Sequence, residues 1–437
     1  MQSKILKISQ QYYDDTNLEH RKKHGQYFTP VDIKSEALSL IEFSDGDSIL
    51  ENSCGTGEFI HSILEINENV NIDAFDIDEQ LVNIVSENFN VNAQCQDFLL
   101  LSETKMYDKV IGNPPYFQMK KADAVEAGYK NYLDVCAGKP NIYAMFIKAS
   151  IDALKVGGEL VYVVPTSMNN GNDFRLLRDY IIEKTNIKNI KLFNDDCFDS
   201  AQQNVMILHL EKLAPEDSND GNYVFTKSGI TIFSTDTDFL HSKFESGSTL
   251  EELGFDVMTG NLVWNQNKPL MSRDNNDLKL VWACNLVDNQ IILDVPKLNA
   301  VQGPDEKRAA KHEKGQYVKK ETTIKQTNDD GAIIDVEVAL NSKPLTGKCI
   351  VVNRVTGAST NAKIRAAIID FGEEEYFVEN HLNYIIRKQS CKHKLEDLLI
   401  ELVKPEVTNF VKKITGNTQI SKKELLKLIP IKLDKKD

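Results

Sequence analysis

The chain has 437 residues, of which 41% are hydrophobic and 27% are charged, and its formal net charge is −14 at pH 7. This composition is typical of a soluble globular protein, and the length favours two domains over a single core. The first residues lack the apolar run of a signal peptide and no apolar stretch reaches membrane-spanning length, so we expect a cytoplasmic protein without membrane contact. The acidic balance argues only weakly against a nucleic-acid partner, because one basic cleft would suffice to bind it.

The seven cysteines are scattered, and none belongs to a C-x-x-C pair. That distribution argues against a disulfide framework and against a zinc ribbon. Cys391 and His393 form the only close Cys/His pair in the sequence, and we expect no metal site.

The chain begins with a polar segment, residues 1 to about 23, whose pattern predicts a helix. A loop follows at residues 25–30. Apolar residues at helical spacing from Val31 to Ile41 then predict a second helix, with Thr29 or Asp32 as its N-terminal cap.

A short strand at residues 48–50 runs into the segment 51–59, which contains Gly55 and Gly57 and leads into a helical pattern. A strand, a tight Gly-x-Gly turn and a helix start form the geometry in which a backbone approaches a nucleotide-like ligand closely. By itself this is a weak signal.

The signal strengthens because a second strand, residues 71–76, ends on Asp76, where a carboxylate can accept hydrogen bonds from ribose hydroxyls. A dinucleotide fingerprint would need a glycine where Ile60 stands, and no Walker phosphate loop is present. Glu58 beside the turn would also repel a pyrophosphate. The pattern therefore favours a ligand that has a ribose and no phosphate.

Two further strands follow, and each ends on a polar residue: residues 93–96 lead to Asp97, and residues 107–112 lead to Asn113. A helix cap or turn cap is the alternative interpretation of Asp97. In an open parallel sheet the carboxyl ends of the strands share one crevice. We therefore expect Asp76, Asp97 and Asn113 to surround one ligand.

The tetrapeptide Asn113-Pro114-Pro115-Tyr116 cannot be helical, because each proline favours extended geometry before it and donates no backbone N–H. It presents the Asn113 amide and the Pro114 carbonyl as acceptors beside the aromatic face of Tyr116. Two acceptors beside a flat apolar plate make a receptor for a planar amine, such as the exocyclic amino group of a nucleobase. The alternative is a proline-rich turn with a buried tyrosine.

A polar stretch after Tyr116 predicts a loop that closes over a substrate, and it carries Lys120, Lys121, Lys130 and Lys139. The α/β pattern then resumes with helices at 141–154 and 175–183 and strands at 160–165, 187–193 and 204–210. Phe198 lies in the polar connection between the last two strands. It could stack on a ligand or fold back onto the core.

After a polar connection at 212–222 and a bridging region, the alternating α/β pattern gives way to a series of strand patterns. We therefore expect domains at 1–245 and 246–437. The second domain has strand patterns at 282–284, 332–340, 349–356, 364–371 and 376–387, and a helical tail at 394–427 broken near Pro405. It also has the basic run 307–314. Such a run is usually a solvated face, but beside a base-binding site it would contact phosphates.

In this order the motifs resemble those of the gamma-class N6-adenine DNA methyltransferases of type II restriction-modification systems, of the NPPY type. The resemblance covers about residues 24 to 211 motif by motif and the remainder by general layout. It implies an α/β fold, a Rossmann-like class I methyltransferase sheet with helices on both faces, plus a C-terminal β-rich α+β target-recognition domain. It implies S-adenosyl-L-methionine as the cofactor.

The resemblance assigns roles residue by residue. It implies cofactor contacts for Tyr27, Thr29, Pro30, Glu51, Ser53, Cys54, Gly55, Gly57, Asp76, Ile77, Asp97, Phe98 and Asn113. It implies a catalytic tetrad of Asn113, Pro114, Pro115 and Tyr116, and stacking of a flipped base on Tyr116 and Phe198. The family usually has Pro-Ala-Cys where Asn52-Ser53-Cys54 stands, which leaves the packing of this loop open.

The implied chemistry is methyl transfer to adenine N6, a poor nucleophile whose lone pair is delocalised into the ring. Acceptance of both amino protons by Asn113 Oδ1 and the Pro114 carbonyl would localise that lone pair. The base would have to be flipped out of the duplex. Weaker candidates for DNA contact are Lys120, Lys121, Asn265, Gln266, Asn267, Lys268, Lys307, Arg308, Lys311 and Arg354.

Double-stranded DNA is therefore the expected partner, with a cognate restriction endonuclease as a further candidate partner, and we expect a monomer. The nearest rival is an amine methyltransferase with the same tetrad that acts on a release-factor glutamine or on RNA, but such enzymes are generally shorter. N4-cytosine methylation is a narrower competitor. A non-catalytic DNA-binding subunit would predict a degraded cofactor loop, whereas Gly55, Gly57 and Asp76 are intact.

Overall fold

The computed structural model describes residues 8–12, 14, 16, 29–102, 105–193, 204–293, 315–327, 333–354, 363–414 and 420–433. The chain divides into two compact units, Met1–Asp238 with Ile414–Asn417 and Phe239–Lys413 with Thr418–Asp437. The predicted division at residue 245 lies close to this break. No helix in the described part of the chain has the length and apolar character needed to cross a membrane.

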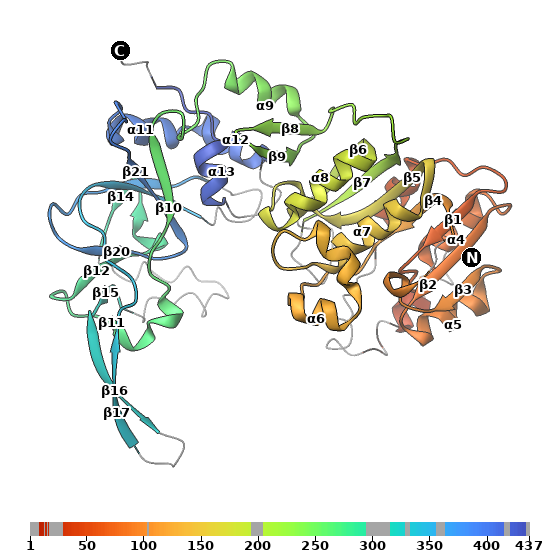
Figure 1. Ribbon diagram of the computed structural model, residues 1–437, viewed down its shortest axis with the longest axis horizontal. Helices are drawn as coiled ribbons and strands as arrows, with labels where there is room; N and C mark the ends of the chain where they lie inside the picture. Colours follow the sequence, from red (N-terminus) through yellow and green to blue (C-terminus); the bar gives the residue numbers. More distant parts are fainter. Residues whose placement is uncertain are drawn as a thin grey trace. The chain divides into compact units, whose positions relative to one another are not determined.

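The first unit is built on a seven-stranded sheet in the order β3-β2-β1-β4-β5-β7-β6 (Figure 1). Its strands are β1 Ser48–Glu51, β2 Asn71–Asp76, β3 Asn92–Cys95, β4 Tyr107–Gly112, β5 Leu154–Pro165, β6 Thr185–Phe193 and β7 Val205–Lys212. β7 runs antiparallel to both of its neighbours, and β1 to β5 are parallel to each other where they pair. The carboxyl ends of β1 to β5 therefore lie at one edge.

Helices cover both faces of this sheet. Along β5 the side chains alternate: Val161 and Val163 pack in one core cluster, and Leu160 and Tyr162 pack in the other. The first cluster includes α3 Val31–Ser39, α4 Glu58–Ile66 and α5 Glu79–Asn88, and the second includes α7 Ile142–Ala153 and α8 Arg175–Lys184 (Figure 1). This is the predicted Rossmann-like class I methyltransferase sheet, and the expected fold class is confirmed.

Two local predictions in the first unit are wrong. Helix α3 has Pro30 at its N-cap position and no side-chain cap, because the Thr29 hydroxyl instead accepts a hydrogen bond from Asn113 Nδ2. The stretch after Tyr116 is not all loop, since it contains α6 Lys121–Glu126 and the 3-10 segment η2 Tyr129–Val135. Further short elements of this unit are η1 Phe98–Leu100, η3 Thr166–Asn169, η4 Asn172–Phe174, β8 Val224–Lys227 and β9 Ile230–Phe233.

The second unit contains two four-stranded sheets, in the orders β10-β21-β18-β19 and β11-β15-β12-β20. Their strands are β10 Phe255–Thr259, β11 Met271–Ser272, β12 Leu278–Val281, β15 Tyr317–Val318, β18 Cys349–Asn353, β19 Ala366–Ile369, β20 Tyr376–Val378 and β21 Leu382–Arg387. The other elements are α9 Thr237–Phe244, η5 Trp264–Gln266, η6 Lys268–Leu270, η7 Ala283–Asn285, β13 Leu286–Val287, β14 Gln290–Ile291, α11 Leu395–Leu402, α12 Pro405–Ile414 and α13 Lys422–Lys427. The β-rich expectation with C-terminal helices is confirmed.

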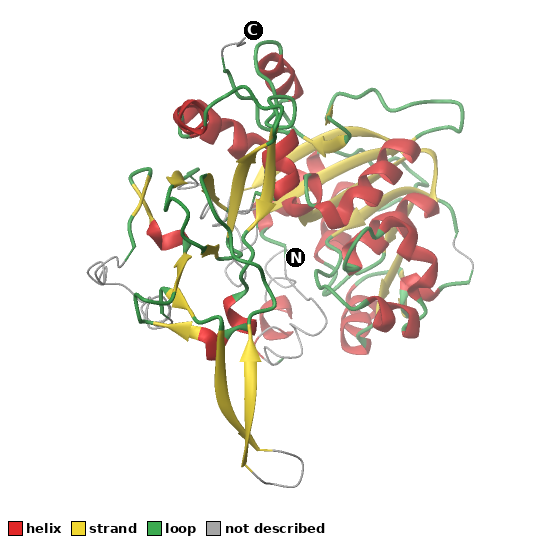
Figure 2. Ribbon diagram, turned by 60° about the vertical axis from the view of Figure 1, so that its left-hand side comes forward, coloured by secondary structure: helices red, strands yellow, loops and turns green. Residues whose placement is uncertain are grey.

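A hairpin of β16 Glu321–Thr327 and β17 Ile333–Ala339 extends away from these sheets (Figure 2). Two strand predictions in this unit need correction. Residues 282–284 do not form a strand, because β12 ends at Val281 and the chain turns into η7. The predicted strand 376–387 is two strands, since the Leu382 N–H bonds to the Glu379 carbonyl in a turn between them.

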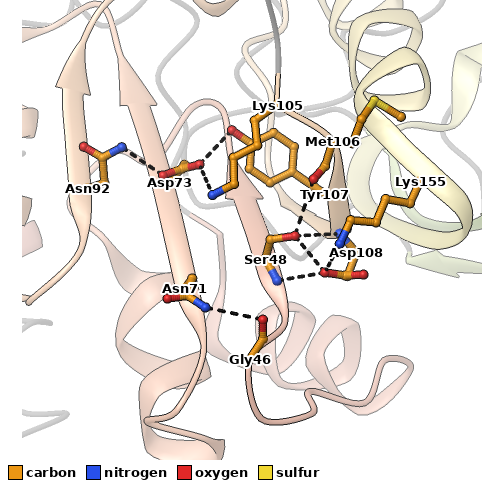
Figure 3. A network of polar contacts seen from close by, with 10 residues as sticks. All are labelled: Gly46, Ser48, Asn71, Asp73, Asn92, Lys105, Met106, Tyr107, Asp108 and Lys155. Carbon is orange, nitrogen blue, oxygen red and sulfur yellow. Dashed lines mark hydrogen bonds and ion pairs between the residues drawn. The ribbon is translucent and has the colours of Figure 1, made fainter.

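A polar network ties the amino-terminal ends of β1 to β4 together (Figure 3). Asp73 on β2 accepts hydrogen bonds from Asn92 Nδ2 at 2.8 Å, the Tyr107 hydroxyl at 2.9 Å and Lys105 Nζ at 3.1 Å. Burial alone would raise the pKa of Asp73, but these three donors lower it below its usual value.

A second carboxylate completes this network. Asp108 Oδ2 accepts from the Ser48 backbone N–H at 2.9 Å, the Ser48 hydroxyl at 2.7 Å and Lys155 Nζ at 2.8 Å (Figure 3). Burial raises the pKa of Asp108, but the hydrogen bonds from Lys155 and Ser48 outweigh that effect and lower the pKa to about 2. Both carboxylates at this edge are thus held in their charged form by protein donors.

Candidate active site

A pocket lies at the opposite edge of the sheet, where β1, β2, β3 and β4 end. Eight of the predicted site residues line it: Ser53, Gly55, Asp76, Ile77, Asp97, Phe98, Asn113 and Pro115. Eight further residues line it that the sequence did not single out as site residues: Tyr12, Asn52, Leu81, Gln96, Phe117, Tyr129, Ile142 and Phe146. Asp76, Asp97 and Asn113 thus line the same pocket, and their contact with one ligand stays a prediction.

The turn after β1 needs both of its glycines. Gly55 and Gly57 have φ values of +52° and +81°, in the left-handed region that other residues rarely adopt. A Cβ on Gly57 would also lie 2.7 Å from the Phe89 ring. The turn exposes the Gly55 N–H toward β2, where it donates to Asp76 Oδ2 at 3.0 Å.

Asp76 therefore holds the glycine turn against the end of β2. Its other oxygen accepts the Asp78 backbone N–H at 3.0 Å. Burial raises the pKa of Asp76 to about 6, although the hydrogen bonds from Asp78 and Gly55 oppose that rise. Each carboxylate oxygen keeps a second lone pair, so the group can still accept hydroxyl protons from a ligand.

Glu51, at the end of β1, is 2% exposed, and its Oε2 atom has no hydrogen-bond partner among the described residues. Burial raises the pKa of Glu51 well above its usual value, and the charges of Asp76 and Glu58 raise it further. A buried acceptor without a donor needs an explanation. A ligand that carries a donor or a positive charge would supply one.

Asp97 caps a turn, as one of its two interpretations proposed, and it also lines the pocket. Its Oδ1 accepts the Leu99 backbone N–H at 3.0 Å, which caps η1, and its Oδ2 accepts the Tyr129 hydroxyl at 2.6 Å. The carboxylate still faces the pocket beside Phe98, whose ring packs against Phe75. The cap is thus the means by which the carboxylate is positioned.

The side chain of Asn113 is held on two sides. Its Nδ2 donates to Thr29 Oγ1 at 3.0 Å, and its Oδ1 accepts from the Tyr116 hydroxyl. That hydroxyl also lies 2.7 Å from the Val163 carbonyl oxygen on β5, and a phenol can donate its one proton to only one of the two oxygens at a time. Asn113 Oδ1 and the Val163 carbonyl therefore share one hydroxyl donor.

Tyr116 is partly buried, with its ring edge-to-face on Tyr143 at a centroid distance of 6.0 Å and an interplanar angle of 83°. Burial raises the pKa of the Tyr116 hydroxyl well above its usual value, and Tyr143 adds to the effect. The hydroxyl thus stays a neutral donor at physiological pH. Tyr116 as a stacking surface stays a prediction.

Seven other predicted residues that the structure describes are not among those that line the pocket: Thr29, Pro30, Glu51, Cys54, Gly57, Pro114 and Tyr116. Thr29 contacts Asn113, Cys54 is buried in the core, and Pro30 precedes α3. Tyr27, Phe198, Lys307, Arg308 and Lys311 lie outside the described residues.

The candidate DNA contacts differ in how free their side chains are. Lys120 and Lys121 at the start of α6 are exposed, as are Asn265, Gln266 and Lys268 in the second unit. Asn267 Nδ2 donates to the Val263 carbonyl at 2.9 Å, and Arg354 Nη1 donates to the Asn380 carbonyl at 3.1 Å. The last two side chains thus have structural partners inside their own unit.

Asn52 explains the departure from the usual Pro-Ala-Cys. Its Nδ2 donates to Ser150 Oγ at 2.8 Å, and its Oδ1 accepts the Tyr162 hydroxyl at 2.6 Å, all in the buried core. The departure from the usual residue at position 52 was the feature of the sequence that could have drawn attention to Asn52. No feature of the sequence marked Tyr12 and Tyr129 as pocket residues, because both lie in polar stretches whose folding depends on distant partners.

The chain has clear relatives among known proteins. The type II methyltransferase M.AccI of Acinetobacter calcoaceticus is 31% identical over a match that covers 46% of this chain and 39% of M.AccI. M.HincII of Haemophilus influenzae is 31% identical over 39% of this chain and 34% of its own length. The modification methylase CviBIII of Paramecium bursaria Chlorella virus NC1A is 24% identical over 94% of this chain and 95% of its own length.

The chain thus spans about a third or more of M.HincII and M.AccI, but nearly all of CviBIII. The model of the Eco57I restriction-modification methylase family matches residues 30–198, which include the glycine turn, Asp76, Asp97 and the Asn113 tetrapeptide. Residues 30–198 are therefore similar to an Eco57I restriction-modification methylase domain.

Proposed function

We propose that this protein transfers a methyl group from S-adenosyl-L-methionine to N6 of a flipped adenine in double-stranded DNA. The observation that supports this most is Asn113: its amide lies at the pocket that Asp76 and Asp97 also line. It is held there by Thr29 and Tyr116. An immobilised acceptor beside a nucleoside-type pocket fits a reaction at an amine.

S-adenosyl-L-methionine is the cofactor that the methylase family and the fold imply, and the residues present fit it. Asp76 can accept ribose hydroxyls, and Asp97 with Phe98 can hold an adenine. The unpartnered Glu51 Oε2 fits the ammonium group of an amino acid. No lysine or arginine is among the described residues that line the pocket, which fits a ligand without phosphate.

When bound, the cofactor supplies an electrophilic methyl group on a sulfonium. Asn113 Oδ1 and the Pro114 carbonyl accept hydrogen bonds from the two N–H groups of the incoming amine, which localises its lone pair. After it gains the methyl group, the nitrogen releases one of its two protons to water. The Thr29 contact keeps the amide from rotating, so that its oxygen rather than its nitrogen meets the amine. No acid–base pair is required for this step.

The target amine is inaccessible inside a duplex, so the base must leave the stack. Stacking on Tyr116 and Phe198, at ~1–3 kcal/mol per base, can offset an unstacking cost of a few kcal/mol. The second unit then reads the sequence, with the exposed side chains of Asn265, Gln266 and Lys268 as candidates. We propose a monomer, with a cognate restriction endonuclease as a separate partner.

The test is methyl transfer from the labelled cofactor to duplex DNA, RNA and protein in parallel, followed by digestion of the nucleic acid and identification of the methylated nucleoside. We expect N6-methyladenine in duplex DNA. N4-methylcytosine would contradict the choice of base, and labelling of protein or RNA alone would contradict the substrate class. Mapping the modified adenines in DNA from expressing cells would give the recognised sequence.

A further inference from the structure

The segment that precedes the methylase domain contributes to the same pocket. Residues 8–12 are helical, and Tyr12 is one of the lining residues. This segment lies outside the range 30–198 that matches the family. Its contacts with the pocket therefore lie outside the matched domain.

Tyr12 is 6% exposed, and its hydroxyl donates to Asp78 Oδ2 at 2.8 Å. Since the hydroxyl is bonded to Asp78, the ring is the part of Tyr12 that can face the pocket. Ile77, in the loop after β2, and Leu81, on α5, also line the pocket, and Ile77 is 55% exposed. An aromatic ring beside exposed aliphatic surface can pack on the flat face of a nucleoside.

A second contact fastens the segment. Ser9 Oγ lies 2.7 Å from Thr56 Oγ1, and these two residues are 5% and 2% exposed. Thr56 belongs to the glycine turn after β1, whereas Asp78 belongs to the loop after β2. The helical segment therefore bridges the glycine turn, which carries Gly55, and the loop that follows Asp76. Gly55 and Asp76 are themselves joined by the hydrogen bond of 3.0 Å.

We propose that Tyr12 is a further ligand-binding residue of this pocket, which packs on the nucleoside part of the ligand and slows its release. The inference rests on the proposed function, because the ligand class is the adenosine of the cofactor. Asp78 orients the Tyr12 ring, and Ser9 holds the helix that carries it. Release of the ligand requires these two contacts to open.

The variants separate the ring from its hydroxyl. Tyr12→Ala removes the packing surface, Tyr12→Phe keeps it but breaks the bond to Asp78, and Ser9→Ala breaks the bond to Thr56. Gln10→Ala is the matched control, because Gln10 lies on the same helical segment with an exposed bond to Asp14. Affinity and dissociation rate are measured for S-adenosyl-L-methionine and for adenosine alone, without DNA, together with the thermal unfolding of each variant.

We expect Tyr12→Ala to weaken both ligands by about tenfold, and by similar factors, because the lost contact is to the nucleoside. Tyr12→Phe and Ser9→Ala should raise the dissociation rate by about two- to tenfold, the effect of one hydrogen bond. Gln10→Ala should bind as the unsubstituted protein does.

Unchanged affinity and dissociation rate in Tyr12→Phe and Tyr12→Ala would overturn the inference. Weakening of S-adenosyl-L-methionine without weakening of adenosine would overturn the nucleoside contact. Because Tyr12→Phe alters one oxygen atom only, it keeps the test decisive if Tyr12→Ala unfolds. Failure of the unsubstituted protein to bind S-adenosyl-L-methionine would instead contradict the proposed function.

Discussion

The two edges of the seven-stranded sheet use the same residue types for opposite purposes. Asp73 and Asp76 lie three positions apart on β2. Asp73, at the amino-terminal edge, receives hydrogen bonds from three side chains, and its pKa is lowered. Asp76, at the carboxyl-terminal edge, receives two backbone N–H groups, and burial raises its pKa to about 6.

β1 repeats the contrast. Ser48 at its start is paired with Asp108 through both its backbone and its hydroxyl, whereas Glu51 at its end has an oxygen without a partner among the described residues. Carboxylates that the protein pairs fully stabilise the fold. Buried carboxylates left with spare acceptor capacity mark the edge where a ligand is expected.

The largest expected effect lies at the carboxyl-terminal edge. Asn113→Ala removes the amine acceptor, and we expect the methyl-transfer rate to fall by about 10²–10³-fold. Cofactor affinity should stay nearly unchanged, since the role of Asn113 is exerted on the amine. Single-turnover transfer and calorimetric binding measure the two quantities, and substantial retained transfer would refute the amine-acceptor role.

At the amino-terminal edge, Asp73→Ala should leave activity per folded molecule intact and lower stability. It strands the Asn92 amide and the Tyr107 hydroxyl without their acceptor, which costs about 1–3 kcal/mol of unfolding free energy. Urea unfolding measures the loss. If Asp73→Ala instead abolished cofactor binding at unchanged stability, the division between the two edges would be wrong.

The acid dependence of Asp73 follows from the same pairing. Its pKa is lowered on folding, so its contribution to stability is present above the unfolded value of about 3.9 and is lost as the pH falls through the folded value. The steepness of acid unfolding should therefore decrease in Asp73→Ala.

Asp76 should show the opposite sign. Its raised pKa means that its protonated form favours folding, so this contribution is present below about pH 3.9 and is lost as the pH rises through about 6. Cofactor binding needs the charged acceptor, so affinity should fall below pH 6 by up to about tenfold per pH unit. Calorimetry over the range of about pH 5 to 8 measures how cofactor affinity depends on pH. Asp76→Asn should remove this pH dependence.

The smallest effect is expected at Asp108. Its pKa of about 2 reflects pairing with Lys155 and Ser48, but both charged groups are partly exposed, so solvent screens the interaction. Asp108→Asn should lower stability by less than about 1 kcal/mol at neutral pH, as measured by urea unfolding. A larger loss would show that the Ser48 contacts, rather than the ion pair, hold β4 to β1.

The sequence by itself determined the carboxyl-terminal edge of the sheet. Strand patterns and the polar residues that follow them placed Asp76, Asp97 and Asn113 together, because parallel strands end at one edge. The glycines of the turn were recognisable for the same local reason, since left-handed backbone favours glycine. Local periodicity also predicted most helices and strands of both units.

Only the tertiary structure decided what holds those residues. The partners of Asn113, Asp97 and Asp78 are Thr29, Tyr129 and Tyr12, which lie many positions away in loops or polar segments. No periodicity marks them, because each is defined by one hydrogen bond that forms when distant segments pack. The same is true of Asp73: the sequence gives no sign that three side chains donate hydrogen bonds to its carboxylate.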